Sequence, residues 1–300
     1  MSTYVESVLT FTSITCITVC GLYILTGLTG MFSLGQASFM ALGAYAAAVL
    51  GKLYGWPFIP CLLVGIILSV ITGFLSGYPI MRLRKEYLTL ITLCYGEAII
   101  ALLNQSNITG GALGMSDIPK HTTLLIAVIF LVFGIFFAWC FRHSKFGRMA
   151  IAIKSDELAS KSMGINMAAV KMRSFLCAAG LAGLAGGLYA FYLQYVDPSL
   201  FGWRKSGEWV AWVFFGGVNS LTGSIVATFG LSALSQFFSR FADYQVLIYS
   251  AMVLLVLNFK PNGVFGYWEL SDLFNTRDRR LQRLLKEAKT REGALNHEQT

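Results

Sequence analysis

The sequence predicts an all-α fold, a polytopic membrane helical bundle with about eight or nine spans and Gly-rich broken or re-entrant helices. Of its 300 residues, 56% are apolar and only 13% are charged, and the mean hydropathy is +0.64. This composition excludes a water-soluble globular protein. The segments 82–86, 142–173 and 261–300 hold 26 of the 38 charged residues. Long uncharged stretches are therefore expected in hydrocarbon, and the charged segments in water.

The spans follow from the length of the apolar stretches. A helix that crosses a bilayer needs about 20 mostly apolar residues. Eight stretches come near this length, at 8–25, 34–51, 57–80, 87–104, 122–141, 174–196, 209–238 and 244–259.

The basic residues orient the bundle, because cytoplasmic loops carry an excess of Lys and Arg. Segment 142–173 has seven basic residues against two acidic ones, and 82–86 and the tail 261–300 are also rich in Arg and Lys. These three segments are expected in the cytoplasm, and 105–120 and 197–207 on the opposite face. We therefore interpret the basic residues as a signal for membrane orientation and not as a nucleic-acid-binding surface.

Two Gly-rich runs interrupt the apolar stretches. A cytoplasmic tail requires an odd number of crossings between 208 and 259, where two stretches are found, and Gly216 and Gly217 predict a break within 209–238. The run from Gly27 to Gly35 interrupts the first half similarly. Two such breaks favour a transporter built from internal repeats, with its pathway near Gly30, Ser33 and Gln36. The alternative is that both runs are tight loops at the membrane surface.

Small residues predict where helices pack closely. In 174–196, Ala179, Gly183 and Gly187 recur at intervals of four residues, a spacing that lets backbones approach within lipid. Gly43 and Ala47 have the same spacing within 34–51. Both stretches are predicted to lie inside the bundle.

Glu97 is the one acidic residue well inside a span. A charge there costs about 2.5–3.5 kcal/mol on insertion scales, so a compensating partner is expected. One interpretation places Glu97 on the transport pathway, and the other gives it a packing role, either protonated or hydrogen-bonded to a neighbouring helix. A proton-coupled carrier usually has several such residues, so a single one counts against secondary transport.

The sequence predicts no catalytic site, metal site or bound cofactor. There is no Gly-rich P-loop for ATP, and the only Gly-Lys pair, Gly51-Lys52, lacks the preceding glycine. The six cysteines form no C-x-x-C pair, and the three histidines are not at metal-ligand spacing.

Segment 142–173 is predicted to contain a short surface helix that ends at Gly164. Its apolar residues Ile151, Ile153, Leu158 and Met163 would pack against a partner, with a charged rim of Lys154, Asp156, Glu157 and Lys161. The alternative is a solvated basic loop at the lipid headgroups.

Several motifs resemble the permease subunits of bacterial branched-chain amino acid ABC importers, and specifically the M-type permease of the pair. They cover residues 20–266 in the family's order. The motifs are Gly27-Leu28-Thr29-Gly30, Ser33-Leu34-Gly35-Gln36-Ala37, Gly43-Ala44-Tyr45, Tyr95-Gly96-Glu97, Thr109-Gly110-Gly111, Gly147-Arg148, Met163-Gly164-Ile165-Asn166, Phe215-Gly216-Gly217 and Phe259-Lys260-Pro261-Asn262-Gly263.

The resemblance implies a multi-pass subunit of the bacterial inner membrane, with a permease domain at 1–260 and a basic cytoplasmic tail at 261–300. Its implied partners are a related permease, two cytoplasmic ATPases that hydrolyse ATP, and a soluble extracytoplasmic binding protein. Residues 150–164 would be the helix that couples to an ATPase, with Ile153, Glu157, Leu158, Ala159, Met163 and Gly164 as contacts. The importer loop pattern E-A-A-x-x-x-G matches only at Ala159 and Gly164, so a glutamate contact does not follow.

The implied cargo is leucine, isoleucine and valine. Urea, short amides or aromatic acids are the alternative, because related permeases are thought to move them. A stand-alone channel or ion-coupled carrier is the alternative of a different class.

Overall fold

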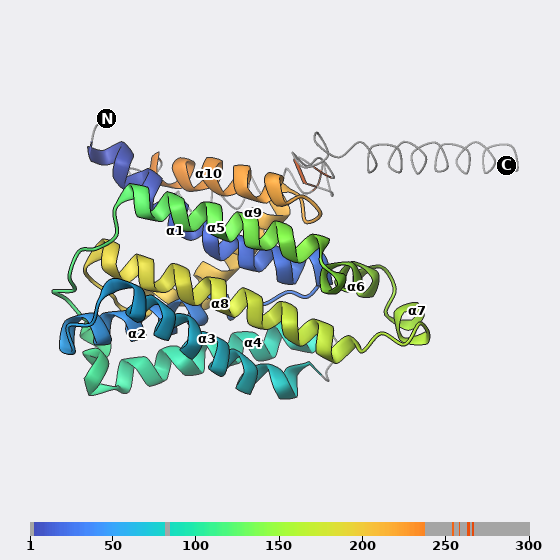
Figure 1. The fold of residues 1–300 in the computed structure, drawn as a ribbon, viewed down its shortest axis with the longest axis horizontal. Helices are drawn as coiled ribbons and strands as arrows, with labels where there is room; N and C mark the ends of the chain where they lie inside the picture. The colour runs from blue at the N-terminus through green and yellow to red at the C-terminus, as the bar shows by residue number, and fades with distance from the viewer. Residues whose placement is uncertain are drawn as a thin grey trace, which may run out of the picture.

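The computed structural model describes residues 3–81 and 85–237, together with residues 254, 258, 263, 264 and 266, and the regular elements within this part of the chain are helices (Figure 1). The expected stretch 244–259 and the tail 261–300 thus lie almost wholly outside the described residues, as does most of the connector 82–86. The long helices are α1 (Thr3–Leu22), α2 (Gln36–Leu53), α3 (Phe58–Ile80), α4 (Lys85–Gln105), α5 (Leu124–His143) and α8 (Met167–Leu193). The shorter helices are α6 (Lys145–Ser155), α7 (Glu157–Ser162), α9 (Trp203–Gly216) and α10 (Leu221–Phe237).

Short helical turns join or extend these elements. A π-helical segment, η1 (Tyr23–Leu28), continues α1 directly, and the short turns are η2 (Asn107–Thr109), η3 (Gly111–Leu113) and η4 (Pro198–Phe201). After η1, Gly30 adopts a left-handed φ of 69°, and the chain is irregular until α2 begins at Gln36.

Five helical segments are long and apolar enough to cross a membrane, counting only the described residues. They are Tyr4–Leu28, Phe58–Ile80, Tyr87–Gln105, Leu124–His143 and Met167–Leu193. Helices α9 and α10 have 14 and 17 residues, which is short for a full crossing. The turn at residues 217–220 separates them, within the long stretch 209–238. The total of eight or nine spans stays a prediction.

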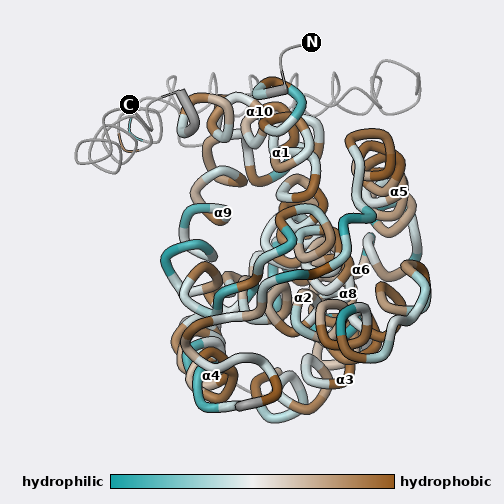
Figure 2. Tube along the Cα trace, turned by 90° about the vertical axis from the view of Figure 1, so that its left-hand side faces the viewer, coloured by the Kyte–Doolittle hydropathy of each residue, from teal (hydrophilic) through white to brown (hydrophobic). Residues whose placement is uncertain are grey.

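Helices α1 and α8 belong to the most buried of the five apolar segments. They are 83% and 78% buried over their most apolar windows, whereas α5 is only 22% buried. Helix α8 packs against α1, α2 and α3. In a view along the bundle, α2 and α8 lie centrally, with α3 and α5 on one side and α4 and α9 on the other (Figure 2).

Small residues set the spacing of α8 from its neighbours. A side chain at Gly43 of α2 would overlap the backbone of Gly183. One at Gly187 would meet Leu62 of α3 and Ala47, and one at Gly73 of α3 would meet Ala179. The three predicted packing residues of α8 therefore lie at helix–helix contacts, as close packing in lipid requires.

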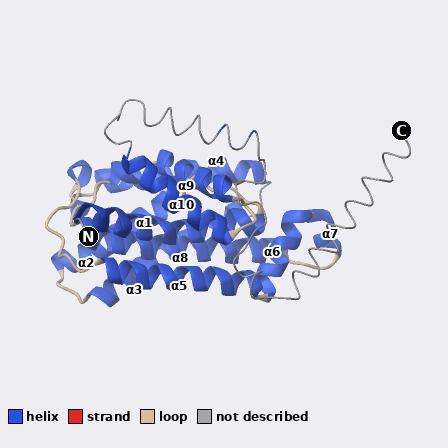
Figure 3. Ribbon diagram, turned by 90° about the horizontal axis from the view of Figure 1, so that it is seen from above, coloured by secondary structure: helices blue, strands red, loops and turns tan. Residues whose placement is uncertain are grey.

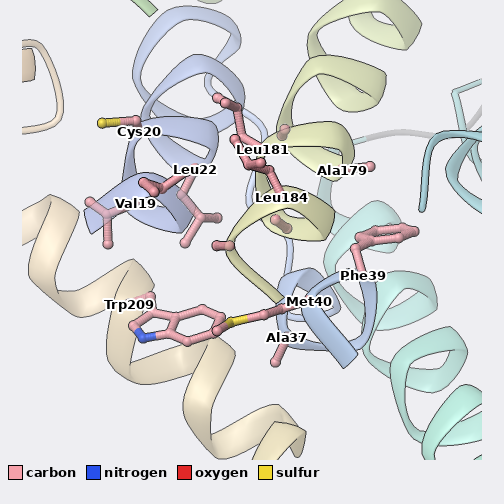
Figure 4. Packing of buried hydrophobic residues seen from close by; sticks show 14 of the residues in the cluster. Val19, Cys20, Leu22, Ala37, Phe39, Met40, Ala179, Leu181, Leu184 and Trp209 are labelled. Atoms are coloured by element: carbon pink, nitrogen blue, oxygen red, sulfur yellow. The ribbon is translucent and has the colours of Figure 1, made fainter. Parts of the chain in front are cut away.

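Larger apolar side chains fill the space between α1, α2, α8 and α9. Val19 and Leu22 of α1 and Leu181 and Leu184 of α8 belong to this cluster, and Met40 of α2 lies against the indole of Trp209 (Figure 4). Each of these side chains is at most 5% exposed. Helix α9 is thus packed into the bundle and lies against the start of α2.

The connections gather at two opposite ends of the bundle. Helices α6 and α7 project from one end, where α3 also finishes, whereas α1 begins at the other end (Figures 1 and 3). At that other end, Met115 and Val196 exchange two backbone hydrogen bonds of 2.9 and 3.0 Å. These bonds connect segment 105–120 to the residue directly before segment 197–207, the two segments that are expected on the outer face.

The first prediction concerns the orientation of these ends. In a cysteine-free background, we expect Ala112→Cys to be labelled from outside intact cells by a water-soluble thiol reagent, and Ser155→Cys only after permeabilisation. Both positions are exposed, so access depends on the side of the membrane. Labelling of Ser155→Cys alone from outside would show that the bundle is inverted.

Candidate functional site

The starts of α2 and α9 meet at the middle of α4. Residues 33–38, 92–97 and 203–207, named here the helix-start junction, form this region. The hydroxyl of Ser206 in α9 accepts a 2.8 Å hydrogen bond from the backbone N–H of Ala37, and so caps α2 from another helix. A side chain at Gly35 would overlap the carbonyl oxygen of Thr92 in α4, and one at Gly96 would lie 3.3 Å from Gly35. Glycine at both positions therefore allows the helices to meet.

The carboxylate of Glu97 is stabilised by the N-terminal end of helix α9. Its carboxylate Oε1 accepts a 3.0 Å hydrogen bond from the backbone N–H of Trp203, the first residue of α9. The N-terminus of a helix has unsatisfied N–H groups and a partial positive charge, so it stabilises a carboxylate. The sequence predicted that Glu97 has a partner. The partner is a backbone group 106 positions away.

Three of the four predicted pathway residues lie at the helix-start junction. Ser33 and Gln36 flank Gly35 and are fully buried, and half-buried Glu97 follows Gly96. The Gln36 Nε2 donates a 2.7 Å hydrogen bond to the carbonyl of Ala178, while its Oε1 has no partner among the described residues. Gly30, in contrast, lies beside Lys154 of α6.

Sequence reasoning did not find Ser206 and Trp203. Ser206 is a single hydroxyl at the start of a helix, and Trp203 contributes only its backbone N–H, which has no residue-type signal. Both are recognisable only once α9 is placed against α2 and α4.

The second prediction separates the charge of Glu97 from its capping role. We expect Glu97→Gln to keep a hydrogen-bond acceptor for Trp203, and thus the amount of folded protein. Uptake of the transported substrate should fall about tenfold, which corresponds to ~1.4 kcal/mol on the rate-limiting step. Uptake and membrane abundance are measured together, with Asp117→Asn, an exposed acid between α4 and α5, as the control. Equal loss of uptake and abundance would show that Glu97 only serves packing.

A second region of interest is the α6–α7 segment, residues 145–162. Ser144 caps α6 by accepting a 3.1 Å hydrogen bond from the N–H of Gly147. Asp156 separates the two helices, because its Oδ1 accepts hydrogen bonds from the N–H groups of Leu158 (2.8 Å) and Ala159 (3.1 Å). The expectation of one helix up to Gly164 was therefore wrong. Aspartate favours the N-cap position and begins a new helix.

The exposed surface of α7 and of the turn after it includes two large apolar side chains. Leu158 and Met163 are 79% and 81% exposed, and Ala159 and Gly164 are exposed beside them. Gly164 has a left-handed φ of 76° and ends the turn after α7. Four of the six predicted coupling residues thus form one exposed surface, named here the α7 tip.

The other two predicted coupling residues face the bundle. Ile153 is fully buried in the core, so it lies outside the α7 tip. Glu157 is half-buried, and its Oε1 forms a 2.6 Å ion pair with Lys171 of α8, whose side chain is 7% exposed. This pair attaches α7 to the central helix.

The placement of Lys154 at a charged rim was also wrong. Its ammonium group points into the bundle and donates hydrogen bonds to oxygens of Gly27 and Asn219. The periodicity of α6 did not reveal this, since the acceptors come from two distant turns.

Comparison with known proteins identifies relatives along most of the chain. Residues 4–257 match the family described as branched-chain amino acid transport system / permease component. The chain is 31% identical to the high-affinity branched-chain amino acid transport system permease protein LivM of Escherichia coli K12, over 85% of this chain and 68% of the relative. It is 23% identical to LivH of the same organism, over 76% and 74%. The probable LivM of Methanocaldococcus jannaschii is 23% identical, over 68% of each chain. No solved structure matches the chain.

Proposed function

The chain belongs to the family of branched-chain amino acid transport permeases, and from this premise we propose that it is the M-type permease subunit of an ABC importer that moves branched-chain amino acids into the cell. Membership is carried by a match over residues 4–257 and by 31% identity to a LivM protein. In this proposal the chain is a transport subunit of the bacterial inner membrane, and partner subunits hydrolyse ATP. The family relation supports multi-pass insertion, as do the five apolar helices among the described residues.

We propose that the α7 tip binds a cytoplasmic ATPase. Leu158 and Met163 expose apolar side chains beyond the end of the bundle, a position where lipid cannot cover them if this end is cytoplasmic. The Asp156 cap and the Glu157–Lys171 ion pair hold α7 in place. A contact that is fixed to α8 can pass a displacement into the bundle, whereas a flexible loop would absorb it.

The helix-start junction is proposed to line the pathway, on the side of the bundle formed by α4 and α9. The outer face of α5 carries large apolar side chains, including Leu125, Phe133 and Phe136, which suit lipid. The α4–α9 side also exposes apolar side chains such as Leu90 and Leu102, but it differs from α5 in exposing Arg204 and half-exposing Glu97. Charged side chains face a bundle interior or a water-filled space in membranes. We therefore place the second, LivH-like permease on this side, with the pathway between the two subunits.

The proposed cargo is leucine, isoleucine and valine, as the names of the relatives indicate. Selectivity is expected to reside largely in the extracytoplasmic binding protein, which would present the cargo to the permease pair. Ligand-dependent melting of the cognate binding protein tests the cargo, with the three amino acids, urea, short amides and aromatic acids compared. Stabilisation by urea or an amide alone would overturn the branched-chain assignment.

Co-purification tests the assembly. When the permease pair is expressed with its ATPases and the tagged chain is isolated in mild detergent, we expect both ATPases and the second permease to be retained. A chain that purifies alone and still catalyses uptake would instead be a stand-alone channel or an ion-coupled carrier.

A further inference from the structure

Two basic side chains connect the two Gly-rich interruptions of the helices, one at the end of η1 and the other in the turn between α9 and α10. The Nζ of Lys154 lies 2.7 Å from the carbonyl oxygen of Gly27 in η1 and 2.6 Å from the Oδ1 of Asn219 in the α9–α10 turn. The Nη1 of Arg142, at the end of α5, donates to the hydroxyl of Tyr23 in η1 and, over 3.1 Å, to the carbonyl of Asn219. These five residues are named here the cationic clamp.

The two interruptions also touch directly. A side chain at Gly27 would lie 2.8 Å from the carbonyl oxygen of Val218, which precedes Asn219. The stem of Lys154 passes close to Gly30, where an added Cβ would lie 3.1 Å from its Cγ. The Gly-rich segment after α1 and the turn between α9 and α10 are therefore in contact, and Lys154 binds both.

Lys154 suits this position electrostatically. Gly27 is in the last turn of η1, and the carbonyl groups at a helix C-terminus lack intrahelical partners and carry partial negative charge. An ammonium group there satisfies such a carbonyl and is itself stabilised by the helix end. Its long stem reaches both acceptors from the last turn of α6.

Helix α6 connects the clamp to the α7 tip. Only Asp156 separates α6 from α7, and Ala150 and Ile153 fix α6 in the core. Movement of α7 thus reaches Lys154 through less than one turn of backbone. η1 is a π-helical segment, and such segments often mark functional sites inside helices.

We propose that Lys154 is a positioning residue for transport, through which displacement of the α6–α7 segment changes the end of η1 and the α9–α10 turn together. This inference depends on the proposed ATPase contact, because it assigns the path by which that contact reaches the pathway. The two interruptions then act as one element whose arrangement differs between states of the transport cycle.

The test uses the complete importer reconstituted in proteoliposomes, with the binding protein and leucine. Lys154→Met removes the ammonium group, Asn219→Ala removes one acceptor, and the double variant combines them. Lys154→Arg restores a cation, and Lys145→Met removes an exposed lysine from the first turn of the same helix. Leucine uptake, ATP hydrolysis and retained ATPase are measured for each.

We expect Lys154→Met to lower uptake about tenfold, within the usual range for coupling between sites, while ATPase is retained and hydrolysis continues. More ATP is then consumed per leucine moved, a ratio that loss of folded protein alone would leave unchanged. Lys154→Arg should restore part of the uptake, Lys145→Met should match wild type, and the double variant should be no worse than the more damaging single one.

Wild-type uptake and an unchanged ATP-to-leucine ratio in Lys154→Met, with the ATPases bound, would overturn the inference and leave the proposed function intact. Effects of Lys154→Met and Asn219→Ala that multiply in the double variant would also overturn it, since they would then act independently. Failure of the wild-type chain to retain ATPases would instead refute the proposed function itself.

Discussion

Ala159→Trp is expected to abolish substrate uptake while the permease remains folded in the membrane at a near-normal level. Ala159 lies on the exposed surface of α7, between Leu158 and Ser160, and contributes to no predicted span. An indole there would hold an ATPase surface away from the α7 tip, so that ATP binding could no longer displace α7. Uptake should therefore fall below about 5% of wild type, a loss of about 2 kcal/mol or more of coupling.

A matched substitution controls for the added bulk. Ala112 is an exposed alanine at the opposite end of the bundle, and Ala112→Trp should transport normally. Gly164→Trp is a poorer test, because any side chain at its φ of 76° strains the backbone. Wild-type uptake by Ala159→Trp with the ATPases bound would show that α7 is not the coupling helix.

Gly186→Ala is expected to reduce stability strongly. The added methyl group would overlap the carbonyl oxygen of Met40 and approach the N–H of Ala44 in α2. These are backbone atoms, so α2 as a whole must move away from α8. Overpacking of this kind costs about 1–3 kcal/mol.

Gly180→Ala, on the same helix, is the control. Its methyl group would lie 3.3 Å from a side-chain carbon of Val70, which can shift slightly. Thermal unfolding in detergent and membrane abundance are compared for the two variants. A Gly186→Ala variant as stable as Gly180→Ala would show that α2 and α8 do not pack as closely as the structure indicates.

The sequence predicted the helical class because that class depends on composition, and it proposed close contacts of α8 from the spacing of small residues. Long apolar stretches can form only helices or barrels in lipid, and small residues four apart share one helix face. The family resemblance, carried by motifs such as Ser33-Leu34-Gly35-Gln36-Ala37, is confirmed by the match over residues 4–257.

The rest depends on contacts that no local pattern encodes. Glu97 is bound by a backbone N–H of α9, and Lys154 by oxygens at two turns far away in sequence. The division of 150–164 at Asp156 was accessible in principle, because aspartate is a preferred N-cap, yet the apolar spacing suggested one continuous helix. Periodicity identified the exposed residues Leu158 and Met163 but not the inward position of Ile153.

ATP-dependent uptake by purified components tests the central claim most directly. Proteoliposomes that contain this chain, its partner permease and two ATPases are supplied with leucine-loaded binding protein, and internal leucine is followed with and without ATP inside. The account predicts accumulation of leucine against its gradient that requires both ATP and the binding protein. Uptake at the same rate without ATP, or by this chain alone, would contradict it.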